Sequence, residues 1–269
     1  MKQQNYSLDD LLAIMAALRD PVNGCPWDKK QTLASIVPHT LEEAYEVADT
    51  IERGAITELP GELGDLLFQI VFYAQLGKEQ SQFDFNDVIQ AINDKLVRRH
   101  PHVFADQVFS SEAQVKANWE QTKAEERQAL DANATSVLDD IPRNLPALTR
   151  ANKIQKRCSA VGFDWRELAP VIDKIHEELE EVKAELTPSL PNQERIADEL
   201  GDLLFACVNL VRHLKKDPEA VLRGANDKFE RRFRMVEKAL QAAGKDSREC
   251  SEEELDRYWQ QAKLAISQQ

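Results

Sequence analysis

The sequence predicts an all-α protein made of two tandem, duplicated helical-bundle domains, and three observations support this fold class. Helix breakers are scarce, with 9 Gly and 11 Pro among 269 residues, whereas Ala, Leu, Glu, Gln and Lys, which favour helices, dominate. Several segments of the first half recur in the second half. The length exceeds that of one average domain, so two domains are expected.

Four segments of the first half return in the same order in the second half. GELGDLLF (61–68) returns as DELGDLLF (198–205), LEEAYEV (41–47) as HEELEEV (176–182), NDKLVRR (93–99) as NDKFERR (226–232), and SEAQVKANWEQTK (111–123) as SEEELDRYWQQAK (251–263). The two copies lie 133 to 140 residues apart, so only small loop insertions separate the halves. Four matches in register indicate a gene duplication.

The duplication predicts the domain boundaries. We expect a first helical domain at 1–128, a linker at 129–147 and a second helical domain at 148–269. The linker contains Pro142 and Pro146 and has no long helical pattern, which is typical of a connection between domains.

Capping signals and hydrophobic periodicity predict the helices. Ser7 with Asp10 is the pattern of a capping box at the start of the first helix, and Ser251 with Glu254 is the same pattern for the last helix. Asp217 followed by Pro218 is a favourable start for a helix that runs to about residue 243. Further long helices are expected at about 38–53, 60–78, 170–186 and 193–215. Residues that recur at helical spacing and should face a core are Phe85, Val88, Ile89, Ile92 and Leu96.

Each half carries two pairs of carboxylates in the same arrangement. The first half has Glu43 and Glu46 followed by Glu62 and Asp65, and the second half has Glu178 and Glu181 followed by Glu199 and Asp202. The members of a pair are three positions apart, which puts both side chains on one face of a helix. A short connection makes the two helices antiparallel neighbours, so the four carboxylates of each half should converge between them.

Four like charges in one place are unfavourable unless something neutralises them. Leu and Phe residues follow Asp65 and Asp202, which indicates a partly buried seam. A divalent cation resolves the conflict, and all-oxygen ligands favour Mg²⁺, with Mn²⁺ as a substitute. A solvated acidic helix face is the common alternative for a single pair, but the second pair beside it and the recurrence in both halves argue against this alternative.

Other classes of site do not fit the sequence. A di-iron bundle requires Glu-x-x-His on its helices, and none of the five His residues has a Glu three positions earlier; His176 has Asp173 at this spacing. Neither a GxxxxGK nor a GxGxxG phosphate-binding loop is present. The four Cys residues are widely spaced and form no CxxC pair, which argues against a zinc site or a disulfide framework.

Charge and hydropathy limit the partners and the location. The net charge of −13 argues against binding to nucleic acid, which requires a cationic face. No apolar run approaches the length that crosses a bilayer, and the polar start lacks the apolar core of a signal peptide. These features favour a cytoplasmic protein without membrane or nucleic-acid partners.

Basic and aromatic side chains accompany the carboxylates in both halves. The basic residues are Lys228, Arg231 and Arg232 in the second half and Lys95, Arg98 and Arg99 in the first. Paired Arg residues beside a metal site can hold phosphate, and ordinary surface ion pairs are the alternative. Trp119 and Trp259 are candidates to stack on a base, or they pack within their own helices.

These motifs together resemble the MazG family of nucleoside triphosphate pyrophosphohydrolases. The resemblance rests on Glu-x-x-Glu followed by Glu-x-x-Asp in ELGDLLF, and on RRHPHVF (98–104) and KFERRF (228–233) in a two-half chain. It implies the all-α pyrophosphohydrolase fold, a homodimer, and Mg²⁺-dependent hydrolysis of nucleoside triphosphates between the α- and β-phosphates. It also implies loose selectivity for base and sugar, and a role in clearing aberrant nucleotides or lowering (p)ppGpp.

The resemblance also implies roles for individual residues. The metal ligands would be Glu178, Glu181, Glu199 and Asp202. The nucleotide would contact Lys174, Glu177, Lys228, Arg231, Arg232, Trp259 and Lys263. Lys174, Glu177 and Glu178 are the candidate catalytic residues, and Glu177, which adjoins the ligands, is the candidate general base. A metal-bound hydroxide is the alternative nucleophile, and the sequence leaves this choice open.

The two halves differ at positions that bear on activity. Lys174 aligns with His39, and Asn209 aligns with Phe72, so the first half lacks one cation and one polar group that could contact the ribose or base. We therefore expect catalysis in the second half. The first half, with Glu43, Glu46, Glu62 and Asp65, should bind metal with weak or no turnover, or serve dimerisation.

Two other functions stay open at this point. One is an enzyme of the same fold with a narrow substrate, such as dUTP. The other is a non-catalytic helical adaptor whose acidic faces bind partner proteins. The largely polar recognition set argues weakly against narrow selectivity, and the adaptor predicts no response to divalent cations.

Overall fold

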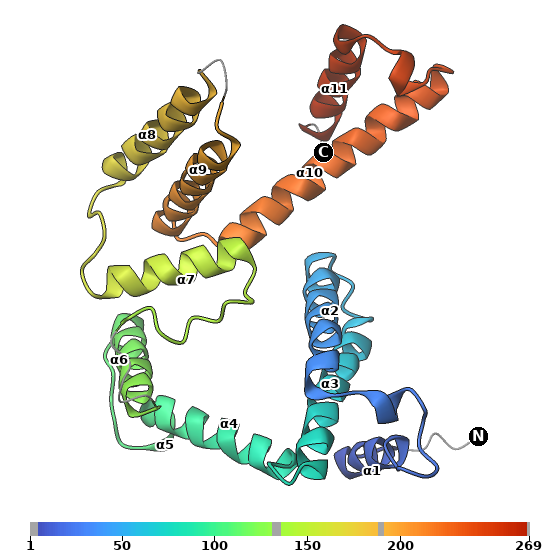
Figure 1. The fold of residues 1–269 in the computed structure, drawn as a ribbon, viewed down its shortest axis with the longest axis vertical. Coiled ribbons are helices and arrows are strands. Elements are labelled where there is room, and N and C mark those ends of the chain that lie inside the picture. The colour runs from blue at the N-terminus through green and yellow to red at the C-terminus, as the bar shows by residue number, and fades with distance from the viewer. Residues whose placement is uncertain (1–4, 131–135, 188–190, 268–269) are drawn as a thin grey trace. The chain divides into compact units, whose positions relative to one another are not determined.

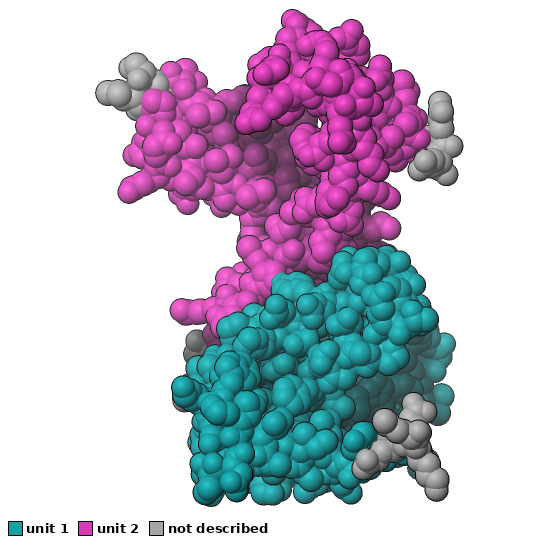
Figure 2. All heavy atoms as spheres, turned by 90° about the vertical axis from the view of Figure 1, so that its right-hand side faces the viewer, with its two compact units in different colours: residues 1–124 teal, residues 125–269 magenta. Residues whose placement is uncertain are grey.

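The computed structural model describes residues 5–130, 136–187 and 191–267, and these residues form helices and no strand (Figure 1). The all-α fold class is therefore confirmed for the described chain. Two compact units, residues 1–124 and 125–269, make up the chain and are coloured separately in Figure 2. The predicted linker at 129–147 includes residues 131–135, which lie outside the described residues, so its limits stay a prediction.

The first unit is organised around a pair of long helices. Its helices are α1 (Leu8–Leu18), the 3₁₀ turn η1 (Asp28–Lys30), α2 (Leu33–Glu52), α3 (Leu59–Glu79), α4 (Phe85–Arg99), α5 (Pro101–Phe104) and α6 (Glu112–Leu130), which continues across the unit boundary. α2 and α3 pack along each other, and α1 packs on α3. The buried core between them consists of Met15, Ile36, Val71, Phe72 and Leu76.

The second unit repeats the helix pair. Its helices are α7 (Ala147–Ala160), α8 (Leu168–Leu186), α9 (Gln193–His213), α10 (Pro218–Ala242), the 3₁₀ turn η2 (Ser247–Glu249) and α11 (Glu252–Ser267). α8 packs along α9 as α2 does along α3, and α7 packs on α9. α10 contacts α7 and α9, and α11 packs on α10 around Val236, Leu240 and Ala262.

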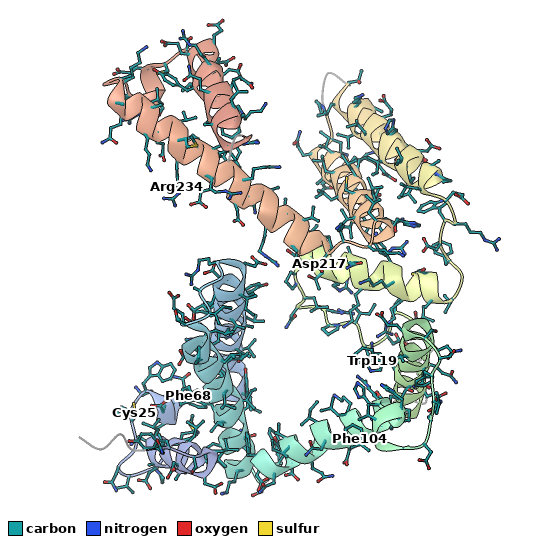
Figure 3. The ribbon with its side chains drawn as sticks, turned by 180° about the vertical axis from the view of Figure 1, so that it is seen from behind. Cys25, Phe68, Phe104, Trp119, Asp217 and Arg234 are labelled. Carbon is teal, nitrogen blue, oxygen red and sulfur yellow. The ribbon has the colours of Figure 1, made fainter. Side chains whose placement is uncertain are left out.

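The capping predictions are confirmed at three helix starts. The Ser7 hydroxyl accepts the backbone N–H of Asp10, whose carboxylate accepts the backbone N–H of Ser7. Asp217 caps α10 by accepting the N–H of Ala220, with Pro218 in the first turn, where no intrahelical donor is needed (Figure 3). The Ser251 hydroxyl accepts the N–H of Glu254 at 3.2 Å, so local sequence determines where these helices begin.

The predicted start of α2 near residue 38 is wrong. The helix begins at Leu33, and Pro38 lies inside it. Thr32 and Ser35 form a capping box upstream of the proline, with each side chain accepting the backbone N–H of the other residue. This local signal outweighs the single backbone hydrogen bond that Pro38 cannot make.

The predicted core face of α4 is also wrong in its larger part. Phe85 packs against the core of the first unit. Ile89, Ile92 and Leu96, however, are each more than 40% exposed. Figure 1 shows α4 leading away from α2 and α3, so the rest of its apolar face stays open in the described chain. None of the described helices is long and apolar enough to cross a membrane.

Candidate functional site

Three carboxylates meet between α8 and α9. Glu178 on α8 and Glu199 and Asp202 on α9 each offer an oxygen atom, and these atoms lie within 4.8 Å of one another. Glu199 and Asp202 reach the same place because residues three positions apart share a helix face. The structure therefore brings together three of the four predicted ligands of the second half, and we call this group the α8–α9 carboxylate group.

The fourth predicted ligand, Glu181, lies one turn further along α8 and is exposed. It does not join the three carboxylates within 4.8 Å. Partial desolvation raises the pKa of Glu181, and the negative charges of Glu178 and Glu199 raise it further. Glu181 thus lies within the electrostatic field of the group, although its oxygens are set apart from it.

Glu178 is the buried member of the group and is only 4% exposed. Its Oε1 atom accepts from the Lys174 ammonium at 2.7 Å, and its Oε2 atom is buried without a hydrogen-bond partner. A buried acceptor without a partner is costly. Three carboxylates around such an atom form the all-oxygen donor set that hard divalent cations prefer.

Lys174 connects the group to the neighbouring Glu177. Its ammonium lies 2.8 Å from Glu177 and 2.7 Å from Glu178. The hydrogen bond to Glu177 makes the largest contribution to raising the pKa of Lys174, and the hydrogen bond to Glu178 makes the next largest. Lys174 is therefore charged at neutral pH. Glu177 itself has a side chain that is 57% exposed, so it is open to solvent and to a bound molecule. The three predicted catalytic residues form one contiguous set on α8.

The predicted nucleotide contacts on α10 and α11 form a second group. The Arg232 guanidinium lies 6.0 Å from the ring centre of Trp259, and the ring of Phe229 lies 5.0 Å from the same ring. Lys228 and Arg231 are exposed nearby on α10, and Lys263 is half-buried on α11. We call these residues the α10–α11 group.

The structure does not bring the α10–α11 group to the carboxylates. α11 packs on α10, and in the described part of the chain it has no contact of similar extent with α8 or α9. α10, which is 25 residues long, carries Lys228, Arg231 and Arg232. The packing of α10 on α7 and α9 connects these residues to the α8–α9 helix pair. Sequence motifs alone do not reveal this separation, because helical periodicity predicts an apolar face but not its partner.

The first unit holds a matching but different carboxylate group. Oxygen atoms of Glu43, Glu62 and Asp65 lie within 4.8 Å of one another, and Glu46 is again outside the group. The pKa of Glu43 is raised by desolvation and by the charges of Asp65 and Glu46. Instead of an ammonium, the buried amide of Gln69 donates to Glu43, at 3.4 Å.

His39 takes the place of Lys174 in the first unit. Its Nδ1 atom lies 3.6 Å from Glu42, and its ring packs edge-on against Trp27. No ion pair between His39 and Glu43 is present among the described residues. The first group is thus more open than the second and lacks a permanent positive charge of its own.

Two features were missed by sequence reasoning. One is Gln69, whose role has no sequence signal beyond its place in the carboxylate helix. The other is an ion pair between Asp164 and Arg212 that also holds Asn209.

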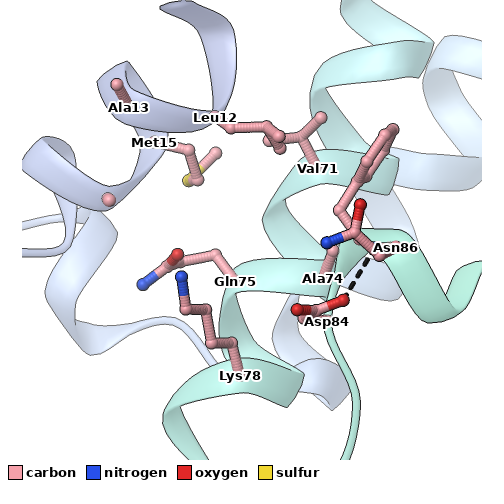
Figure 4. A pocket seen from close by; sticks show the side chains of 11 residues that line it. Leu12, Ala13, Met15, Val71, Ala74, Gln75, Lys78, Asp84 and Asn86 are labelled. Carbon is pink, nitrogen blue, oxygen red and sulfur yellow. Dashed lines mark hydrogen bonds between the residues drawn. The ribbon is translucent and has the colours of Figure 1, made fainter. Parts of the chain in front are cut away.

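A cavity of about 230 Å³ lies elsewhere in the first unit, between α1, α3 and the start of α4 (Figure 4). It is lined by apolar residues such as Met15 and Val71 and by the polar Gln75 and Lys78. None of the predicted metal or nucleotide residues lines it. The cavity is therefore separate from both carboxylate groups.

Comparison with known proteins supplies independent information. The family pattern of the MazG nucleotide pyrophosphohydrolase domain matches residues 31–104. A nucleoside triphosphate pyrophosphohydrolase of Escherichia coli (strain K12) is 56% identical over 256 residues, which cover 95% of this chain and 97% of that protein. The nucleoside triphosphate pyrophosphohydrolase/pyrophosphatase MazG of Thermotoga maritima is 41% identical over 98% of each chain. A nucleoside triphosphate pyrophosphohydrolase of Mycobacterium tuberculosis is 37% identical over 60% of this chain and 47% of its own length.

Proposed function

Since the chain belongs to the MazG family of nucleoside triphosphate pyrophosphohydrolases, we propose that its second unit hydrolyses nucleoside triphosphates between the α- and β-phosphates. The products are a nucleoside monophosphate and pyrophosphate. The observation that carries the assignment to this unit is Glu178, a buried carboxylate with an unpartnered oxygen beside two further carboxylates and a lysine.

The α8–α9 carboxylate group fits a divalent cation. Glu178, Glu199 and Asp202 would hold it, and Glu181, one turn from Glu178, would be the fourth ligand. We infer Mg²⁺, with Mn²⁺ as a substitute, because all the available donors are carboxylate oxygens. When bound, the cation would neutralise phosphate charge and polarise the phosphoryl group under attack.

The residues of the chain itself supply the other catalytic contributions. The Lys174 ammonium, which now pairs with Glu178, stabilises negative charge that develops on a phosphate oxygen. The exposed Glu177 accepts a proton from the attacking water, and its ion pair with Lys174 keeps its carboxylate beside the reacting phosphate. On α10, Lys228, Arg231 and Arg232 bind the leaving pyrophosphate, while Trp259 stacks on the base and Lys263 contributes a further cation.

A homodimer accounts for the apolar surface of the second unit. Leu200 and Leu204 on α9 and Phe229 and Phe233 on α10 are all exposed, and Leu204 is 60% exposed. Exposed apolar faces of this kind indicate association, and a two-fold dimer covers the same face on both chains. The same association would supply the α10–α11 group to the carboxylate group of the other chain.

The proposed substrate range is broad. Few of the site residues are of a type that selects one base, so the common ribo- and deoxyribonucleoside triphosphates should all be accepted. The proposed roles are the clearance of aberrant nucleotides and the lowering of (p)ppGpp. We place this activity in the cytoplasm, where these substrates are. A narrow dUTP-like specificity is the second candidate, and a non-catalytic adaptor is the third.

One assay separates these functions. The full chain is incubated with Mg²⁺ and a panel of NTPs and dNTPs, and monophosphate, pyrophosphate and orthophosphate are measured. Broad pyrophosphate release supports the proposal, release from a single nucleotide supports the narrow enzyme, and no turnover supports the adaptor. Orthophosphate as the direct product would contradict cleavage between the α- and β-phosphates.

A matched pair of variants assigns the activity to one unit. Asp202→Asn should abolish pyrophosphate release, since Asp202 belongs to the group that contains Lys174 and the buried Glu178. Asp65→Asn, the same change at the aligned position of the first unit, should leave most of it. The reverse result would move the catalytic site to the first unit.

A further inference from the structure

An ion pair in the second unit has no part in the mechanism described so far. Asp164 lies in the connection between α7 and α8, and the two terminal nitrogens of Arg212 on α9 donate to its two carboxylate oxygens at 2.8 and 2.6 Å. The His213 ring nitrogen lies 3.0 Å from the same carboxylate. Both partners of the ion pair are largely buried, and a two-bond geometry of this kind holds the guanidinium plane in one orientation.

The same guanidinium also holds the amide of Asn209. The Nε and one terminal nitrogen of Arg212 donate to the Asn209 side-chain oxygen at 2.9 and 2.7 Å. Arginine has donors and no acceptor, so the amide oxygen must face it and the amide nitrogen must face away. The ion pair therefore fixes Asn209 as a hydrogen-bond donor with one defined direction.

Asn209 lies on the helix face that carries the carboxylates. It follows Asp202 by seven residues, which places it two turns further along the same face, at a distance of about 10 Å along the axis. Between them on this face lies the small Ala206. A triphosphate bound at the carboxylates must extend its sugar and base away from them, and the next side chains on this face of α9 are Ala206 and Asn209, which are both largely buried.

The first unit has a different ion-pair network, in which Arg19 of α1 pairs with Glu79 of α3. The aligned residues are Phe72 at Asn209 and Gln75 at Arg212, and Phe72 is fully buried in the core. Gln75 instead donates to Glu79 on its own helix. In the first unit the amide nitrogen of Gln75 is thus engaged by Glu79, whereas the ion pair of the second unit holds the amide oxygen of Asn209 and leaves its nitrogen facing away. This difference occurs in the unit that also carries Lys174 and indicates a function there.

We propose that the amide nitrogen of Asn209 donates a hydrogen bond to an acceptor on the sugar or base of the substrate, and that Arg212 and Asp164 are positioning residues that hold it for this contact. The inference deepens the function proposed above and rests on catalysis in the second unit. It concerns recognition of the nucleoside, which the carboxylates and Lys174 do not contact.

The test separates nucleoside recognition from phosphate binding. KM and kcat for ATP are measured with the full chain in Mg²⁺, together with the inhibition constant of inorganic triphosphate, which has no nucleoside. Asn209→Ala and Arg212→Lys should each raise the KM for ATP about tenfold, the loss expected for one hydrogen bond. The inhibition constant of triphosphate and the kcat should change by less than about twofold, a change too small to represent such a bond.

Two controls make the result specific. Arg195→Lys alters another arginine of α9, whose guanidinium pairs with Glu185, and should leave the KM unchanged. The double variant Asn209→Ala with Arg212→Lys should be no worse than Asn209→Ala alone, because both changes remove the same contact. With 2′- and 3′-deoxy-ATP, loss of the Asn209→Ala effect assigns the acceptor to the missing hydroxyl, and persistence with both analogues assigns it to the base.

Several outcomes would overturn the inference. An unchanged KM in Asn209→Ala, a parallel rise in the inhibition constant of triphosphate, or additive effects in the double variant would each do so. If Arg212→Lys fails to fold, Asp164→Asn is judged by the same criteria. A wild-type chain that releases no pyrophosphate refutes the proposed function itself, whereas an active wild type with an unaffected Asn209→Ala variant refutes only the role of Asn209.

Discussion

At the scale of single residues, Glu178 is where stability and chemistry oppose each other. Its carboxylate is buried beside Glu199 and Asp202, and one of its oxygens has no partner. Lys174 compensates part of this charge. Residues that act on a substrate are often suboptimal for the folded state, and removing the conflict commonly stabilises a protein at the expense of function.

Glu178→Gln should therefore raise the melting temperature in the absence of divalent cations. The amide keeps the shape of the side chain and removes the repulsion with Glu199 and Asp202, while Lys174 keeps Glu177 as a partner. A gain on the order of 1 kcal/mol corresponds to a few degrees. Thermal unfolding followed by circular dichroism, with and without Mg²⁺, measures both effects.

The same experiment tests cation binding. Mg²⁺ should raise the melting temperature of the wild type by linkage, and this rise should shrink in Glu178→Gln. Glu180→Gln is the matched control, since Glu180 is on the same helix, is exposed and pairs with Lys183; its Mg²⁺ response should equal that of the wild type. A lower metal-free melting temperature in Glu178→Gln would contradict the interpretation.

At the scale of elements, the connection between α7 and α8 is tied to α9 by Asp164. Its carboxylate accepts hydrogen bonds from Arg212, and these lower the pKa of Asp164 far below its usual range. The pKa of an Asp in an unfolded chain is about 3.9. Because the folded pKa lies below this value, the ion pair stabilises the fold fully above about pH 4 and loses this effect as the pH falls through the folded pKa.

Asp164→Asn should lower the free energy of unfolding at pH 7 by about 2–3 kcal/mol, the contribution of hydrogen bonds to a charged group. The difference from the wild type should stay constant between pH 7 and 5 and become smaller below about pH 4, where Asp164 takes up a proton in the unfolded chain but keeps its charge in the folded one until the pH falls through the folded pKa. Urea unfolding at several pH values measures it. Asp246→Asn, which breaks an exposed pair with Arg248, should have little effect. A difference that does not depend on pH would show that the ion pair is not its source.

The elements also show what the sequence can and cannot predict. Ser7, Asp217 and Ser251 were recognisable because a cap depends only on residues within one turn. The predicted start of α2 near residue 38 was too late because the capping box of Thr32 and Ser35 begins the helix upstream of Pro38. The core face of α4 was predicted from periodicity, but periodicity contains no information about whether another element covers that face.

At the scale of the whole molecule, duplication has preserved one arrangement and changed its surroundings. Both units bring three carboxylates within 4.8 Å of one another. Spacing and recurrence were enough to predict three of the four expected members of each group, since helix geometry converts an interval of three residues into proximity, but Glu46 and Glu181 lie outside the groups. The tertiary partners were not predictable in this way. Lys174 lies beside Glu178 by the same helix geometry, since the two are four positions apart on α8, whereas Gln69 beside Glu43 became evident only once α2 and α3 were packed.

The separation between the α10–α11 group and the carboxylates is the main difference from what the motifs predicted. Each motif was recognised, but motif recognition assumes that all of them meet in one chain. The exposed Leu204 on α9 and Phe229 on α10 suggest that a second copy completes the surface. We therefore propose that the site depends on the association of two chains.

Leu204→Glu should convert the protein from a dimer into a monomer. A charge at this 60% exposed position does not disturb the core of the chain, but burying it in a two-fold interface places two like charges on the same apolar face. Light scattering should give twice the 30.6 kDa chain mass for the wild type and the chain mass for the variant.

Val108→Glu, at an exposed position outside these helices, should stay dimeric. Pyrophosphate release should fall together with dimer content if, as proposed above, the residues of α10 and α11 act on the carboxylates of the other chain. A monomeric Leu204→Glu variant with full activity would show that one chain assembles the site alone, and a dimeric one would move the interface away from α9.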